Sequence, residues 1–241
     1  MVTDKAESTE RTTHFEEVEI QGNNIKFLSR EFAEDDEKYA ITYSCCEKIC
    51  ELLKIEIPNI SISSDLGGGK LGYTFHRKDW KVLDKSLIQM IWNEDQFHYV
   101  GVLAHELRHV WQGVYAKQIL GKRIDYARNG EEAGSNPAEI DADGFAVFYL
   151  HMISGKSIDE CAEKFLDGMV CTIPYIRRVD RAEDISDMIQ SGKSDREYIK
   201  KAVNYYKINP RRKEKAKQMI IRVCIYGFLA YGIYCWGKLT L

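Results

Sequence analysis

The spacing of hydrophobic residues predicts short strands and one long helix in the amino-terminal part of the chain. Mixed runs on either side of the polar segment Gln21–Asn24 predict a β-hairpin from Phe15 to Leu28. Residues 32–54 repeat apolar side chains at helical intervals, which indicates an amphipathic helix. Beyond Pro58, Asn59–Ser63 alternates apolar and polar residues as a half-buried strand does, and Leu71–Phe75 and Leu87–Trp92 are two further expected strands. The Gly67–Gly69 triplet lacks the frame of a phosphate-binding motif and is predicted to be a simple loop.

The carboxy-terminal part is predicted to be mainly helical. Asn136 is placed to cap a helix and Pro137 suits its first turn. Pro210 ends the helical region before a basic run at 211–217. The elements expected here are a strongly apolar helix over 99–119, a polar loop over 121–135, a helix over Ala138–Ile153, and a helical region over 157–206 with breaks at Pro174 and Gly192. Strands followed by helices predict an α+β fold with a helical carboxy-terminal extension.

Composition describes an ordinary globular protein of 241 residues, with 44% hydrophobic and 29% charged residues. The net charge of -3 gives no general electrostatic case for nucleic-acid binding, and we predict none. The seven cysteines are an odd number and form no CxxC pair, which indicates a reducing compartment. Residues 1–13 are polar and predicted to be disordered. They have neither the basic start nor the apolar run of a secretory signal, so a cytoplasmic location is expected.

Residues 217–241 combine basic residues with an apolar run. Positions 223–236 are fourteen uncharged, largely apolar residues between Arg222 and Lys238. This run is short for a bilayer span, which needs about 20 apolar residues. A buried core helix, a self-association face and a membrane-seeking tail with the basic run on cytoplasmic lipid all fit the pattern.

The sequence VGVLAHELRHVWQ contains the residues with the clearest chemistry. His105 and His109 are four positions apart, so a helix projects both from one face toward a single point. Glu106 lies beside them, within reach of a water molecule on a metal held by the two imidazoles. Zinc lowers the pKa of such a water and Glu106 would take its proton, which is the chemistry of a zinc metallopeptidase. The apolar residues that lead the motif argue against two histidines on a solvated face.

A catalytic zinc ion usually takes a third protein ligand, which we expect downstream. The best candidate is Glu139, with Asp143 on the same helical face bonding the outer ring nitrogen of a histidine. Asp141 or Asp143 as the direct ligand, and His151, remain alternatives. The HExxHxxGxxH pattern is excluded because positions 112 and 115 are Gln and Tyr.

HExxH followed at a distance by ExxxD resembles the gluzincin arrangement. More narrowly, AHELRHVWQ followed by NPAEIDADGFA resembles the small ImmA/IrrE-type metallopeptidases, over roughly residues 58–152. The resemblance implies Zn²⁺ bound by His105, His109 and Glu139, with Glu106 catalytic. It also implies a minimal zincin-like domain and a specific intracellular protein as substrate. The expected organisation is a disordered segment 1–13, a metallopeptidase domain 14–155, a helical extension 156–216 and the basic-then-apolar segment 217–241.

Other parts of the site are less constrained by sequence. Tyr126, His98 and Arg108 are candidates to stabilise a developing oxyanion, and none is singled out. Zincin folds place an edge strand beside the active-site helix, and Leu87–Trp92 is the candidate, although its apolar content also fits a core strand. The alternatives to a free enzyme are a non-catalytic zinc-fold interaction module and a peptidase tethered to a membrane by residues 217–241. Oligomeric state is left open.

Overall fold

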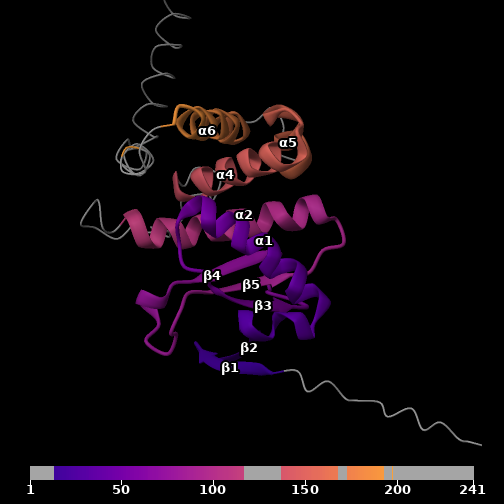
Figure 1. The fold of residues 1–241 in the computed structure, drawn as a ribbon, viewed down its shortest axis with the longest axis vertical. Coiled ribbons are helices and arrows are strands. Elements are labelled where there is room, and N and C mark those ends of the chain that lie inside the picture. The colour runs from indigo at the N-terminus through magenta and orange to yellow at the C-terminus, as the bar shows by residue number, and fades with distance from the viewer. Residues whose placement is uncertain (1–13, 117–136, 168–172, 193–196, 198–241) are drawn as a thin grey trace, which may run out of the picture.

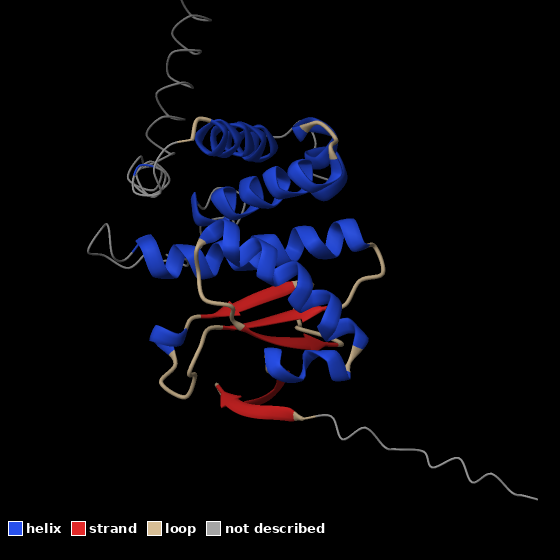
Figure 2. Ribbon diagram, in the orientation of Figure 1, coloured by secondary structure: helices blue, strands red, loops and turns tan. Residues whose placement is uncertain are grey.

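The computed structural model describes residues 14–116, 137–167, 173–192 and 197. Within them a five-stranded mixed sheet lies on one side of the molecule, and helices stack on its other side in successive layers (Figures 1 and 2). This arrangement is the α+β class that the sequence predicts. The segments predicted at 1–13, 121–135, 211–217 and 223–236 lie outside the described residues.

The sheet has the strand order β1-β2-β3-β5-β4. Its strands are β1 (Phe15–Ile20), β2 (Asn23–Leu28), β3 (Asn59–Ser63), β4 (Gly72–Phe75) and β5 (Leu87–Ile91). β3 and β5 run parallel, whereas the other neighbouring pairs are antiparallel. The predicted hairpin is confirmed: Gln21 and Gly22 both have positive φ (55° and 78°), as a two-residue hairpin turn of the favoured twist requires.

One strand prediction is wrong in its position. Leu87–Ile91 is flanked by β3 and β4, so it is an inner strand of the sheet and not the edge beside the active-site helix. The edge strand that packs against α2 (Gln96–Trp111) is β4. The apolar content of this segment predicted a strand, but the order of strands depends on pairings between distant segments.

Two helices pack directly on one face of the sheet: α1 (Glu37–Leu53) and α2. The side chain of Asp36 caps α1 and that of Asp95 caps α2 by accepting backbone N–H groups of the first turn. α2 therefore begins before the predicted residue 99. After Trp111 the chain continues as the short π-helix η3 (Gln112–Ala116).

The remaining helices form the outer layers. They are α4 (Pro137–Ser154), α5 (Ile158–Phe165) and α6 (Ile173–Gln190), with short 3-10 turns η1 (Arg30–Asp35) and η2 (Arg77–Asp79) nearer the sheet. α4 packs on α2, and α6 packs on α4 (Figure 1). Pro174 lies in the first turn of α6 and does not interrupt a helix; the interruption falls between α5 and α6 instead.

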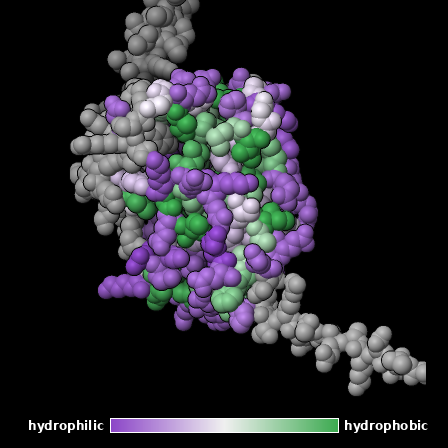
Figure 3. Space-filling model, in the orientation of Figure 1, coloured by the Kyte–Doolittle hydropathy of each residue, from purple (hydrophilic) through white to green (hydrophobic). Residues whose placement is uncertain are grey.

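The larger of two hydrophobic core clusters in the described residues joins these layers. It extends from Ile88 and Met90 of the sheet through Leu103 and Leu107 of α2 to Ile185 of α6. The described helices of the predicted extension thus share the core of the predicted metallopeptidase domain. On the face of the molecule shown in Figure 3, hydrophobic side chains lie among hydrophilic ones. No described helix combines the length and apolar composition needed to cross a bilayer.

Candidate metal centre

Three potential metal ligands meet between α2 and α4. The chain contributes His105 and His109 from α2 and Glu139 from the first turn of α4, and one ligand atom of each lies within 4.8 Å of the others. The Nε2 atoms of the two histidines are 3.0 Å apart. Oε2 of Glu139 lies 3.3 Å from Nε2 of His105 and 3.6 Å from Nε2 of His109. The helix packing thus brings together the three residues that sequence spacing selects.

The distances fit a small tetrahedral ion. Ligand atoms bound at about 2.0–2.1 Å with tetrahedral angles are about 3.3–3.4 Å apart, close to the three separations observed. Two imidazole nitrogens and a carboxylate oxygen are also a donor set that divalent transition metals accept. These residues could therefore hold a metal ion.

The centre is partly open to solvent. The side chains of His105, His109 and Glu139 retain 15%, 10% and 28% exposure. A structural metal site is usually closed by four protein ligands, whereas a catalytic site keeps a position for water or substrate. Three ligands with an accessible side match the catalytic pattern.

The outer ring nitrogen of each histidine has a partner. Nδ1 of His105 lies 2.7 Å from Oδ1 of Asp143, as the sequence predicts. Nδ1 of His109 lies 2.8 Å from Oε1 of Gln112. The Gln112 amide donates to the Ala138 carbonyl and to Asp141, so its oxygen must face His109 and accept. Both imidazoles therefore carry hydrogen on Nδ1 and present Nε2 to the centre.

Glu106 does not join the three ligands and is held beside them by the edge strand. Glu106 is only 6% exposed, and its Oε2 accepts a hydrogen bond from the Thr74 hydroxyl at 2.7 Å. Gly72 of the same strand is so close that an added Cβ would lie 2.7 Å from Cγ and Oε1 of Glu106. The absence of a side chain at Gly72 creates the space that Glu106 occupies.

The charges of the centre are strongly coupled. Burial disfavours the charged form of His105, but the Asp143 carboxylate, with smaller contributions from Glu139 and Glu106, outweighs it and raises the pKa well above its ordinary value. Burial likewise opposes charge on Glu139, yet hydrogen bonds from His105 and His109 lower its pKa. The pKa of Asp143 is lowered because His105 and Arg178 outweigh its burial. A metal ion would therefore compete with protons for the imidazoles.

The alternative ligands are placed elsewhere. Asp141 is fully buried behind the centre and accepts hydrogen bonds from Arg108, Arg181 and Gln112. Nδ1 of His151 lies against the Lys156 carbonyl, near the end of α4. Neither belongs to the group of ligand atoms that converges on the centre.

The structure also separates the candidates for oxyanion stabilisation. Arg108 is 0% exposed and engaged with Asp141, so it is a buried ion-pair partner rather than a group that meets substrate. His98 lies near the start of α2 against the Phe165 ring. Tyr126 lies outside the described residues.

Four residues of the site were not identified from sequence: Gly72, Thr74, Gln112 and Arg178. Gln112 is three positions beyond His109, so helical spacing could have indicated it. Gly72, Thr74 and Arg178 lie more than thirty positions along the chain from the site residues that they contact. No local sequence pattern marks them.

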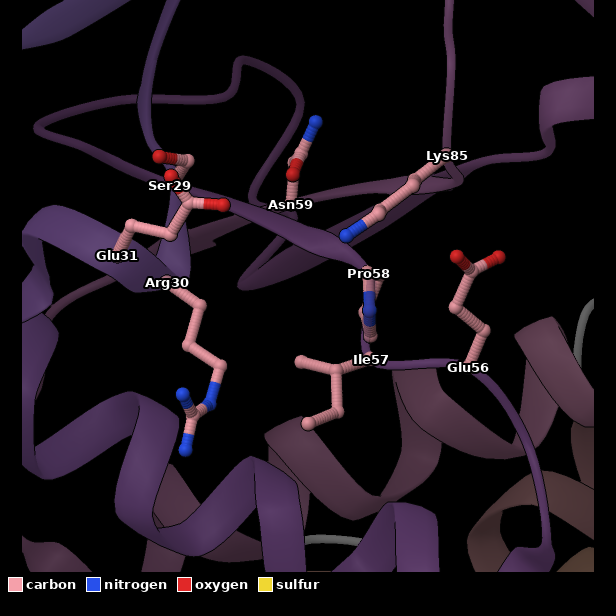
Figure 4. Close-up of a pocket in the computed structure, with 8 residues that line it drawn as sticks. All are labelled: Ser29, Arg30, Glu31, Glu56, Ile57, Pro58, Asn59 and Lys85. Carbon is pink, nitrogen blue, oxygen red and sulfur yellow. The ribbon is translucent and has the colours of Figure 1, made fainter.

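Away from the metal centre, a hollow lies at the junction of η1 and β3 (Figure 4). Its charged lining residues are Arg30, Glu31, Glu56 and Lys85, and Arg30 is already paired with Glu47. Cations and carboxylates are interspersed, so the hollow offers no single charge to a ligand, and none of its lining residues belongs to the metal centre.

Comparison with known proteins adds no relative to this description. No protein-family model, no curated protein sequence and no solved structure matches the chain. The case for function therefore depends on the geometry of the centre.

Proposed function

We propose that this protein is a zinc-dependent metallopeptidase that hydrolyses a peptide bond in a protein or peptide. The observation that carries the proposal is the convergence of His105, His109 and Glu139 beside a fourth residue, Glu106, that is held close without being a ligand. A structural metal site needs ligands but no general base, whereas hydrolysis needs a base such as the Glu106 carboxylate.

Zinc is the metal that best suits the residues. Two imidazoles and one carboxylate with an accessible fourth position are the ligand set of many catalytic zinc sites. When bound, zinc would supply the Lewis acidity that activates water and polarises a substrate carbonyl. Because Asp143 and Gln112 hold the Nδ1 hydrogens, each histidine would offer Nε2 to the metal once the ring has lost its second proton.

Glu106 would remove the proton from the attacking water and deliver it to the leaving amine. We assign the proton to Oε1, because Oε2 already accepts the Thr74 hydroxyl. The hydrogen bond and the close approach of Gly72 restrict the carboxylate to one orientation, which spares the enzyme from ordering it during the reaction.

The position of β4 supports an extended peptide as substrate. β4 is one of the two edge strands of the described sheet, and its Gly72 and Thr74 lie against the proposed base. An extended chain could add to this edge through main-chain hydrogen bonds, which would bring its carbonyl groups past Glu106. The zincin-like character of the fold, a specific intracellular protein as substrate and a cytoplasmic location are parts of the same proposal.

Metal analysis combined with hydrolysis tests the proposal. Purified wild type should contain about one zinc per chain and cleave a quenched fluorescent peptide library, and Glu139→Ala should lose both properties. Glu106→Gln should keep zinc and lose hydrolysis. Glu51→Gln, an exposed change on α1, is the matched control and should retain both. Hydrolysis that survives in Glu106→Gln would refute the assigned base, and a wild type without zinc would refute the enzyme class.

A further inference from the structure

Helix α6 carries two arginines that reach the carboxylates behind the metal centre. Arg178 and Arg181 are 4% and 3% exposed, although arginine is rarely buried without a partner. Their partners are Asp143 and Asp141 of α4. Residues 173–190 are far from the HExxH motif in sequence, and nothing in the proposed chemistry requires them.

The first connection runs from α6 to His105. The two carboxylate oxygens of Asp143 have different partners. Oδ1 is hydrogen-bonded to Nδ1 of His105, and Oδ2 accepts a hydrogen bond from Nε of Arg178. Rotation of this carboxylate would break both contacts at once. The guanidinium therefore fixes the orientation in which Asp143 can hold the imidazole.

The second connection runs from α6 to His109. Oδ1 of Asp141 accepts Nε of Arg181 at 2.8 Å, and its Oδ2 accepts the Gln112 amide at 3.0 Å. Gln112 in turn bonds His109. Here α2 supplies a second cation, because Arg108 also bonds Asp141.

Close packing of α6 on α4 makes these contacts feasible. An added Cβ at Gly144 would lie 2.7 Å from Cγ of Arg181 and 3.2 Å from the Arg178 carbonyl. Gly144, which directly follows Asp143 on α4, thus lets the backbone of α6 approach. Tyr175 and Ala182 anchor the same helix in the shared core.

We propose that Arg178 is a positioning residue for the metal centre, and that docked α6 raises the metal affinity of His105 and its companion ligands. The inference rests on the proposed function, since it concerns the same metal. Arg181 acts in the same way on the second histidine, with a smaller effect because Asp141 also bonds Arg108. Coupling of this kind is reciprocal, so metal binding also stabilises the docked position of α6.

A double-mutant cycle tests whether Arg178 acts through Asp143. Zinc dissociation constants are measured by competition with a chromogenic chelator for wild type, Arg178→Met, Asp143→Ala and the double variant. Loss of an outer partner of a metal ligand costs about 10- to 100-fold in affinity, and we expect roughly tenfold weaker binding for Arg178→Met. In the Asp143→Ala background the same change should alter binding by less than about twofold.

The controls separate positioning from general loss of charge or fold. Arg30→Met removes an arginine paired with Glu47 at the surface and should leave zinc affinity unchanged. The double variant removes both members of the buried pair, so no unpaired buried carboxylate unfolds it. Zinc affinity of Arg178→Met within twofold of wild type, or an equal loss in both backgrounds, would overturn the inference. A wild type that binds no zinc would refute the proposed function and this inference with it.

Hydrogen exchange on the wild type alone gives an independent measurement. Zinc should slow amide exchange in α6 more than in the β1–β2 hairpin, which supplies neither a candidate ligand nor the Asp143 and Gln112 partners of the histidines. Equal protection of both segments would contradict a specific coupling.

Discussion

Gly72→Ala is expected to slow hydrolysis strongly while leaving the fold and the zinc content intact. The new Cβ would lie 2.7 Å from Cγ and Oε1 of Glu106 and 3.0 Å from its Cδ, against 3.4 Å for ordinary van der Waals contact. Glu106 must therefore retreat by about 0.7 Å. The atoms that must move are the end of a flexible side chain, so the fold can accommodate the methyl group at small cost.

The loss of activity follows from that displacement. A misplacement of about 1 Å in a reacting group can cost about 100-fold in rate, so we expect kcat/KM to fall by roughly 10- to 100-fold. This corresponds to about 1.4–2.7 kcal/mol of transition-state stabilisation. Because Glu106 is not a ligand, zinc content should stay at the wild-type value.

The assay compares zinc content, urea unfolding and cleavage of a peptide selected from the fluorescent library. Gly101→Ala serves as the contrasting variant, because its Cβ would lie 2.5 Å from the Phe165 ring in the core. Overpacking there should cost about 1–3 kcal/mol of stability with little change in activity per folded molecule. If Gly72→Ala keeps kcat/KM within threefold of wild type, the close approach does not position the base and the reasoning fails.

Three further predictions concern the surroundings of the centre. Thr74→Val removes the hydroxyl that bonds Glu106 and should lower kcat about tenfold with zinc content unchanged, whereas Thr74→Ser should retain activity; equal rates for the two variants would contradict this role. Arg108→Met breaks a fully buried pair with Asp141 and should cost about 3 kcal/mol in urea unfolding, and a cost below about 1 kcal/mol would show the pair to be dispensable. Folding raises the pKa of His105, so the metal-free protein binds a proton more tightly when folded. This contribution to stability is complete below the unfolded value of 6.5 and is lost as the pH rises through the folded pKa. Unfolding in EDTA should therefore be easier at pH 9 than at pH 6, and the opposite order would refute the assigned charges.

Local spacing determined much of the site in advance. His105 and His109 share a helical face because four residues make about one turn, and Glu139 and Asp143 share a face of α4 for the same reason. The class of fold and the bounds of β3 followed similarly from hydrophobic periodicity. These features depend on neighbours within one element, which is why a sequence pattern is enough to predict them.

Tertiary structure alone decided what surrounds those ligands. The apolar content of Leu87–Ile91 suits an inner strand and an edge strand equally, and only its pairing with β3 and β4 made it an inner one. That order put Gly72 and Thr74 against Glu106, and the packing of α6 on α4 put Arg178 behind Asp143. These contacts join separate elements across more than thirty positions, so they follow from how helices and strands pack and not from any pattern along the chain.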